Sequence, residues 1–354
     1  MRNILLNPGP ANTTLSVKMA QVVDDICPRE KEFGSIMESV SQDLLSFVKC
    51  DEKARAVLFG GSGTLAVESC LASVVGNKKI VIVKNGAYGE RMEEIAKYHE
   101  LNYATFESSF LEPLDFDKLE KFVDAQRPYF LAVVHSETTS GLLNSLSDIS
   151  KICKKNNIKI IADCMSSYAC YELSLMEVDF IIASSNKNLQ GMAGISFVIA
   201  NEENILMAKY SKSLYLDLKA QYEYFVKNYQ MRFTPPVQTL YALKQAIFEL
   251  KREGLENRFL RYKKNNEILQ KGLEKLGFEI FPKTQKSVII TSIKMPNTII
   301  FDEMHDFCKS KGYTIYPGKI SNLSMFRVAN IGDIDEVDIA GFLEVLEIFL
   351  KGKK

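Results

Sequence analysis

Short apolar runs that end abruptly in polar residues recur along the first two thirds of the chain. Two of them are adjacent, "IKIIADCMSSY" at residues 158–168 and "VDFIIASSNKNLQG" at residues 178–191. Runs rich in β-branched residues predict buried strands that carry functional side chains at their carboxyl ends. The first run ends at Asp163 and the second leads to Lys187. Neighbouring strands of an open α/β sheet would place both at the rim where such sheets bind ligands.

The same pattern predicts further strands and the helices between them. Apolar runs at residues 54–60, 79–84 and 129–135 end in polar clusters, and another strand is expected around residues 102–107. A strand in residues 191–204 is expected to return antiparallel at the edge of the sheet. Apolar residues at helical spacing predict helices in the following ranges: 16–50, with an interruption at 27–34, 115–124, 146–157 and 203–230.

Pro235 and Pro236 break the element before them, and a long amphipathic helix follows. We therefore expect an N-terminal arm at residues 1–15, a large α/β domain at 16–235 and a smaller α+β domain at 236–354. In the small domain, Arg327 lies on a short apolar strand. A partly buried arginine requires an anionic partner, which is either a carboxylate or phosphonate ligand or a local acid such as Asp333.

Composition narrows the possible partners and location. The 354 residues include 44 basic and 44 acidic side chains, so nothing indicates a nucleic-acid partner. No apolar run is long enough to cross a bilayer and the start does not resemble a signal peptide, which favours a cytoplasmic protein without a membrane partner. Seven scattered cysteines without a C-x-x-C spacing and three distant histidines favour reduced thiols and no metal site.

Lys187 and Asp163 together suit pyridoxal 5′-phosphate. That cofactor needs a lysine amine for its Schiff base and an acid that faces its pyridine nitrogen and keeps the ring protonated. The simpler alternative is a surface lysine after one strand and a capping aspartate after the other. Tyr88, between two glycines after a strand, could stack on a flat ring, although a lone tyrosine is more often a packing residue.

The glycine turn at residues 60–64, "GGSGT", joins a strand to an apolar helix and exposes amide donors at the helix N-terminus, where Ser62 and Thr64 add hydroxyls. This pattern indicates an anion site. Residues 61–66 also satisfy the dinucleotide fingerprint G-x-G-x-x-A, which requires an acid after the second strand. That strand ends in Lys84 and Asn85, so a single phosphate fits better. A plain tight turn is the third interpretation.

The chain resembles class V pyridoxal-phosphate aminotransferases, in order and along nearly its whole length. Three of its motifs resemble the branch that exchanges amino groups between 2-aminoethylphosphonate and pyruvate: "HSETTSG", "SNKNLQG" and "NIG". The motifs shared more widely are "LLNPGP", "GGSGTLAVE", "KNGAYGERM", "ADCMSSY" and "RFTPPVQT". Ala329 departs from the usual glycine of the family, and Asn188, Tyr168 and Ala169 are further departures.

The resemblance implies fold type I, with a mainly parallel seven-stranded sheet in the large domain, and a homodimer with shared active sites. It implies that Lys187 holds the cofactor and that Asp163 faces the pyridine nitrogen. The other implied cofactor contacts are Ser62, Gly63, Thr64, Tyr88, Thr138 and Ser185, with Thr234 reaching the cofactor of the other subunit. The implied substrate contacts are Arg327, Pro10 of the "NPGP" arm and Arg29.

The implied activity is transamination of 2-aminoethylphosphonate with pyruvate to give phosphonoacetaldehyde and L-alanine, or its reverse. Within the same class, an alanine or serine:glyoxylate or a serine:pyruvate aminotransferase is the alternative. More distant alternatives are an NADP-dependent oxidoreductase that uses the turn at residues 61–66 and a binding protein without catalysis.

Overall fold

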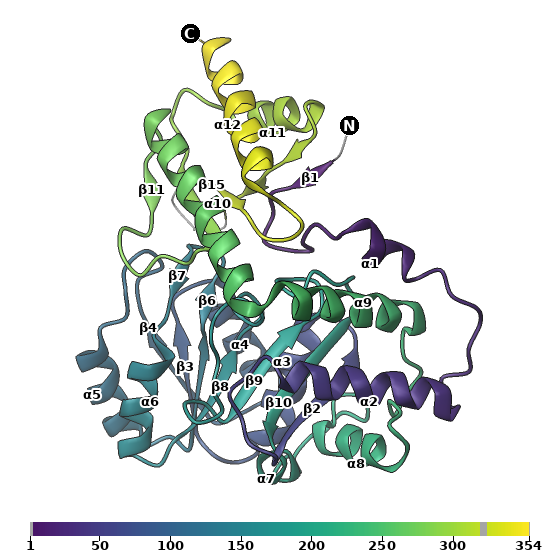
Figure 1. Cartoon of the computed structure of the whole chain (residues 1–354). Helices are drawn as coiled ribbons and strands as arrows, with labels where there is room; N and C mark the ends of the chain where they lie inside the picture. Colours follow the sequence, from purple (N-terminus) through teal and green to yellow (C-terminus); the bar gives the residue numbers. More distant parts are fainter. Residues whose placement is uncertain (1–2, 319–323, 354) are drawn as a thin grey trace.

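The computed structural model describes residues 3–318 and 324–353. They form two parts, each with its own sheet and helices, which are called the large layer and the small layer below (Figure 1). The large layer is built on a seven-stranded sheet in the order β2-β10-β9-β8-β5-β3-β4. Its strands are β2 (Ala54–Gly60), β3 (Ile80–Lys84), β4 (Tyr103–Glu107), β5 (Phe130–Val134), β8 (Lys159–Asp163), β9 (Phe180–Ser184) and β10 (Ile195–Asn201). Parallel pairs join β9, β8, β5, β3 and β4. The expected mainly parallel α/β sheet is therefore confirmed.

β10 runs antiparallel to its neighbours, as expected, but its predicted position at the sheet edge is wrong. It pairs with β9 on one side and with β2 on the other. All but the last of its residues are buried. A strand that is apolar at successive positions suits an interior place, because both of its faces are then covered by helices.

Alternate residues of the strands pack against helices on opposite faces of the sheet, which is the period of two that a strand imposes. Leu131 and Val133 of β5 join the core that includes four helices: α2 (Lys31–Leu45), α5 (Phe116–Gln126), α6 (Leu146–Lys155) and α9 (Val237–Glu253). Phe130 and Ala132 join the opposite core, which includes α3 (Gly63–Val74), α4 (Ala87–Tyr98), α7 (Glu202–Leu206) and α8 (Leu218–Asn228).

The small layer consists of an antiparallel sheet and three helices. Its strands, in order, are β11 (Ile280–Phe281), β12 (Ile290–Lys294), β15 (Met325–Ala329) and β14 (Tyr316–Pro317), and its helices are α10 (Leu255–Lys275), α11 (Phe301–Ser310) and α12 (Glu336–Lys351). The start of the chain also belongs here, because β1 (Ile4–Leu5) pairs with β13 (Tyr313–Thr314). The short α1 (Leu15–Met19) follows, and β6 (Ser136–Glu137) pairs with β7 (Leu142–Leu143) in a hairpin.

One boundary expected from the sequence stays untested, and one expected helix is wrong. The division after residue 235 stays a prediction; α9, which follows it, contributes Leu240 and Leu243 to the core of the large layer. The chain then turns at Gly254, which has a φ of +84°, into α10. The single helix expected over residues 203–230 is wrong: α7 and α8 are separate, and α8 begins where the Asp217 side chain accepts a hydrogen bond from the Ala220 amide.

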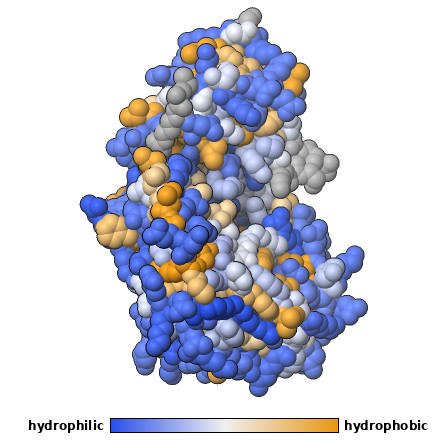
Figure 2. All heavy atoms as spheres, turned by 90° about the vertical axis from the view of Figure 1, so that its right-hand side faces the viewer, coloured by the Kyte–Doolittle hydropathy of each residue, from blue (hydrophilic) through white to orange (hydrophobic). Residues whose placement is uncertain are grey.

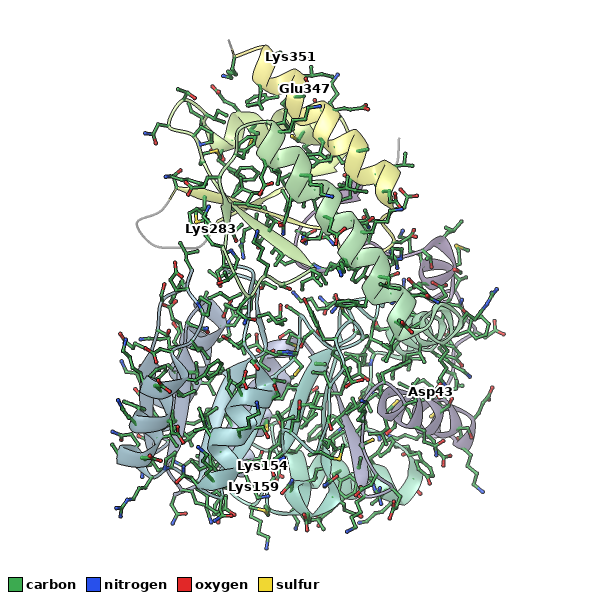
Figure 3. The ribbon with its side chains drawn as sticks, turned by 60° about the vertical axis from the view of Figure 1, so that its left-hand side comes forward. Asp43, Lys154, Lys159, Lys283, Glu347 and Lys351 are labelled. Carbon is green, nitrogen blue, oxygen red and sulfur yellow. The ribbon has the colours of Figure 1, made fainter. Side chains whose placement is uncertain are left out.

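The strand directions bring the carboxyl ends of the parallel strands toward the small layer. Lys159, at the start of β8, lies at the end of the large layer away from the small one (Figure 3), so Asp163, at the end of the same strand, faces the small layer. The surface is hollowed between the two layers (Figure 2). Within residues 3–318 and 324–353, no helix is long and apolar enough to cross a membrane.

Candidate active site

A cavity lies at the carboxyl ends of the parallel strands of the large sheet. Its walls come from the ends of β5, β8 and β9, the first turn of α3 and the start of α4. The lining residues are Gly63, Thr64, Val67, Tyr88, Arg91, Val134, Ser136, Asp163, Met165, Ser166, Ser184, Asn186 and Lys187. Five residues implied by the sequence are thus brought to one place: Gly63, Thr64, Tyr88, Asp163 and Lys187.

Burial shifts the pKa of both central residues toward neutrality. Asp163 is 4% exposed, and burial raises its pKa to about 6 against the opposing hydrogen bond from the Met165 amide, which is 2.9 Å from Oδ1. Burial lowers the pKa of Lys187 to about 8; the charge of Asp163 opposes this shift, and Arg327 and Arg91 add to it. An amine with such a pKa is partly neutral, and hence nucleophilic, near pH 8.

The N-terminal arm covers Lys187. Lys187 Nζ donates a hydrogen bond to the carbonyl of Pro8, which belongs to the arm. Gly9, with a φ of +130°, lies so close that a Cβ there would be 2.6 Å from Cδ of the lysine. The Ala11 amide then donates to the Asn186 carbonyl at 2.9 Å. Pro10 therefore lies beside the lysine loop but does not line the cavity, and its own side chain is exposed.

The start of α3 offers an anion site. Ser62 is the N-cap of α3, and the described residues give its side chain no capping hydrogen bond. A Cβ at Gly63 would lie 2.5 Å from Sδ of Met165, so only glycine fits there without a shift. Arg91 Nη1 lies 3.4 Å from Thr64 Oγ1 and adds positive charge. Helix-terminal amides next to an arginine are a favourable site for a phosphate.

Arg327 is 1% exposed and holds its position through backbone carbonyls. Nε donates to Pro317 at 3.0 Å and Nη1 to Thr138 at 2.8 Å. Within the described ranges, Nη2 is buried without a hydrogen-bond partner. The hydrogen bonds of Nε and Nη1 go to Pro317 and Thr138, and neither goes to Asp333. Burial lowers the pKa of this guanidinium. A buried N–H without a partner is costly and is expected where a ligand completes it.

The remaining implied residues lie outside the cavity lining. The hydroxyl of Ser185 donates to the Ile195 carbonyl at 3.1 Å, and the buried Thr138 Oγ1 lacks a partner among the described residues. Arg29 donates to the Met231 carbonyl at 2.6 Å and so binds the chain itself. Thr234 is exposed and does not line the cavity of its own chain.

Two charged residues were not predicted for the site. Arg91 follows Tyr88 by three positions on α4, and its guanidinium lies 5.0 Å from the centroid of the tyrosine ring. The helical spacing could have indicated this pair. Glu137 is fully buried, which raises its pKa, and it accepts hydrogen bonds from the Tyr88 amide at 3.2 Å and the Thr139 amide at 3.0 Å. Its position in the cluster after β5 was visible in the sequence, but its contact with Tyr88 was not.

These residues fit pyridoxal phosphate. An amine with a lowered pKa and a buried carboxyl group share one cavity, the start of α3 suits a phosphate, and Tyr88 supplies a ring. Among the described residues, Thr138 Oγ1 and Arg327 Nη2 are buried without a hydrogen-bond partner. The fold and the site together define a pyridoxal-phosphate enzyme of fold type I.

The comparisons with known proteins agree. Residues 12–332 match the family Aminotransferase class-V, and the chain belongs to this family. A 2-aminoethylphosphonate–pyruvate transaminase of Phocaeicola vulgatus is 38% identical, with 98% of this chain and 99% of that protein covered. One of Bacillus cereus is 37% identical, with 95% and 94% covered. A bifunctional phosphonoacetaldehyde hydrolase/aminoethylphosphonate transaminase of Clostridioides difficile is 34% identical, with 98% of this chain and 56% of that protein covered.

Solved structures show the same fold at lower identity. A ureidoglycine–glyoxylate aminotransferase of Bacillus subtilis has a TM-score of 0.91 at 22% identity, with 100% of this chain and 94% of that one covered. An alanine–glyoxylate aminotransferase of Nostoc has a TM-score of 0.91 at 23% identity, with 99% and 96% covered. The cofactor of this family is pyridoxal phosphate, as the sequence implied.

Proposed function

We propose that this protein transfers an amino group between 2-aminoethylphosphonate and pyruvate, giving phosphonoacetaldehyde and L-alanine, or catalyses the reverse. The names of the relatives with 37–38% identity over nearly the whole chain support this reaction. The observation that carries it in the structure is the buried Arg327, whose Nη2 has no hydrogen-bond partner among the described residues and whose charge helps to lower the pKa of Lys187. Both substrates bring an anionic group to the site.

When bound, pyridoxal phosphate supplies an electron sink for the electron pair that an amine-bearing carbon keeps when it loses its proton. Lys187 would attach it covalently and then carry that proton as base and acid. Asp163, as a carboxylate, would pair with the pyridinium, and the start of α3 with Ser62, Gly63, Thr64 and Ser185 would hold the phosphate. Tyr88 would pack on the ring. The arm would keep water from Lys187 by covering it.

Arg327 would serve both half-reactions, since its planar fork forms bidentate bonds with a phosphonate or a carboxylate. A shared anion site makes the two substrates competitors. We therefore expect excess pyruvate to slow turnover with 2-aminoethylphosphonate, which steady-state rates at rising pyruvate would show. If pyruvate never inhibits, a single shared arginine is wrong. Pro10 and Arg29 stay proposed substrate contacts; for Arg29 this would require release from the Met231 carbonyl.

An aminotransferase that uses alanine or serine with glyoxylate is the second candidate, since the same site would accept a carboxylate alone. Loading the protein with cofactor and mixing it with one amine at a time separates the two. We expect 2-aminoethylphosphonate to change the cofactor's visible absorbance faster than serine at equal concentration. Faster reaction with serine would overturn the proposed substrate. The dinucleotide alternative is weakened because Lys84 is paired with Glu93 at 2.9 Å and Glu107 at 2.7 Å.

We also propose that the active form is a homodimer in which Thr234 serves the site of the other subunit. An exposed Thr234 outside its own cavity supports this. Exposed apolar side chains on α1 and α9, in the segment after α1 and in the segment before α8 also support it, because such residues favour burial against a second copy. They include Leu15, Met19, Val22, Leu214, Tyr215 and Phe248. The cytoplasmic location expected from the sequence stays part of the proposal.

The name of the C. difficile relative joins an aminoethylphosphonate transaminase to a phosphonoacetaldehyde hydrolase. The second of these reactions consumes the aldehyde that the proposed transamination releases. This supports phosphonoacetaldehyde as the product when the reaction runs from 2-aminoethylphosphonate.

A further inference from the structure

Glu253, the last residue of α9, lies at the junction between the two layers, where the chain turns at Gly254 into α10. One carboxylate there holds two arginines from the first turns of α10. Oε2 accepts from Arg258 Nε at 2.8 Å and from Nη2 at 2.5 Å, while Oε1 accepts from Arg261 Nε at 2.8 Å. Burial raises the pKa of Glu253, but the hydrogen bonds from Arg261 and Arg258 outweigh it and keep the pKa lowered.

Arg258 connects this carboxylate to the cofactor lysine. It is 2% exposed, and its Nη1 donates at 2.6 Å to the carbonyl of Asn188, the residue after Lys187. The side chain of Asn188 in turn donates to the carbonyls of Ser166 and Tyr168 at 3.1 and 3.0 Å. The loop that carries Lys187 is therefore fixed between Arg258 and the segment that follows Asp163.

Arg261 connects the same carboxylate to the small layer. Its Nη1 donates to the carbonyls of Gly332 and Ile334 at 2.8 and 3.0 Å, in the turn that directly follows the strand of Arg327. The turn is fixed from a second side as well, because the Gly332 amide donates to the Tyr262 hydroxyl at 2.9 Å. The two arginines thus share one carboxylate but reach opposite halves of the site.

We propose that Glu253 is a positioning residue that fixes the loop of Lys187 and the turn after Arg327 relative to each other, through Arg258 and Arg261. The substrate must span these two side chains, with its amine at Lys187 and its anionic group at Arg327, so their separation sets which substrates react. The proposal rests on the roles given above to Lys187 and Arg327. Guanidinium groups suit the task because each bonds the carboxylate and a carbonyl at fixed angles.

The two arginines also bond different parts of the site. Among the hydrogen bonds of the described residues, Arg258 donates to the lysine loop, whereas Arg261 donates to the turn at Gly332. A general loss of stability would affect both halves of the site together. A positioning role predicts that each arginine affects only its own half, and that Glu253 affects both.

The experiment compares Arg258→Lys, Arg261→Lys and Glu253→Gln in the full-length, cofactor-loaded protein. Lysine keeps the charge but lacks the planar fork, whose separate nitrogens bond the carboxylate and the carbonyl in each arginine. Three quantities are measured: the dissociation constant of pyridoxal phosphate, the dissociation constant of methylphosphonate as an unreactive anion, and the melting temperature. Lys264→Gln is the matched control, because Lys264 on the same helix pairs with Glu336 at 2.5 Å on the surface.

We expect Arg258→Lys to weaken cofactor binding about tenfold and Arg261→Lys to weaken methylphosphonate binding about tenfold, each with little effect on the other ligand. Glu253→Gln is expected to weaken both, and Lys264→Gln neither. If the arginine variants only lower the melting temperature, or weaken both ligands equally, the proposal is wrong. The two lysine variants decide the matter even if Glu253→Gln does not fold. Failure of the proposed substrate pair would appear separately, as a wild-type protein that binds cofactor but does not turn over 2-aminoethylphosphonate.

Discussion

At the scale of single residues, burial shifts the pKa values of Lys187 and Asp163, and the charge of each opposes the shift of the other. Both are buried in one cavity, and burial favours the neutral form of each. The pKa of Lys187 moves down to about 8 and that of Asp163 up to about 6, while their opposite charges limit both shifts. Near pH 7 both groups are therefore charged, and a small change in surroundings neutralises either one. Such a pair suits a site that must release an amine and then protonate it.

The lowered pKa of Lys187 has a kinetic consequence. Only the neutral amine attacks the cofactor's aldehyde, so we expect the rate at which cofactor-free protein captures pyridoxal phosphate to rise with pH, with a midpoint near 8. Stopped-flow absorbance between pH 6.5 and 9.5 measures this rate, where both limits are about 1.5 units from the midpoint. Asp163→Asn is expected to lower the midpoint, because the Asp163 charge raises the lysine pKa. A rate that is flat across this range would contradict the assignment.

The raised pKa of Asp163 affects stability. Its folded pKa lies above its unfolded value, so the folded state binds the proton more tightly and stability falls as pH rises from about 4 to about 6. At pH 9, where Lys187 is neutral in the folded protein, Asp163→Asn should therefore stabilise the cofactor-free protein by roughly 2–3 kcal/mol. Urea unfolding at pH 9 and pH 4 tests this. A variant that is less stable than wild type at pH 9 would show that the charged Asp163 carboxylate does not destabilise the folded protein.

Sequence reasoning found the residues whose position depends on the end of a strand or the start of a helix. Asp163, Lys187 and Gly63 are of this kind, because a buried run and a glycine turn fix their place in the sheet. It did not find Arg91 or Glu137 as site residues. Their contacts with Tyr88 depend on how α4 lies against the hairpin after β5, and no local pattern specifies that arrangement.

At the scale of elements, the N-terminal arm covers Lys187, and Gly9 allows the close approach. Gly9→Ala places a methyl group 2.6 Å from the Lys187 side chain and strains a φ of +130°. We expect the arm to be displaced and kcat/KM to fall by about tenfold or more, while the melting temperature falls only slightly, since the strain is of order 1–3 kcal/mol. Gly277→Ala is the control: it has a φ of +87° but nothing within 4 Å. Equal activity of the two variants would exclude a role of the arm in activity.

The two elements that the sequence misplaced each have a physical cause. β10 was taken for an edge strand because its direction reverses, yet its apolar side chains need cover on both faces. The helix expected over residues 203–230 divides because Asp217 caps a new helix, and tyrosine-rich segments have no clear period. Buried parallel strands and capped amphipathic helices were predictable, because burial and periodicity then agree.

At the scale of the whole molecule, the large layer carries the residues proposed to hold the cofactor and the small layer carries Arg327, so the proposed site lies where two separate cores meet. A homodimer would add a third contribution, Thr234. If sites are shared, equal mixing of Lys187→Ala and Thr234→Val subunits should restore about a quarter of wild-type activity, because half of the dimers then hold one intact site of two. Subunits are exchanged by refolding together and assayed for alanine formation. Activity no higher than that of each variant alone would exclude the shared site.

Amino-group transfer itself is the most direct test of the account. Purified, cofactor-loaded protein is given 2-aminoethylphosphonate carrying a nitrogen-15 label and unlabelled pyruvate, and the label is followed by mass spectrometry. We expect the label to appear in alanine with an equal amount of phosphonoacetaldehyde, and we expect the Lys187→Ala variant to form neither. Labelled alanine formed by the variant at the wild-type rate, or none formed by the wild-type protein, would contradict it.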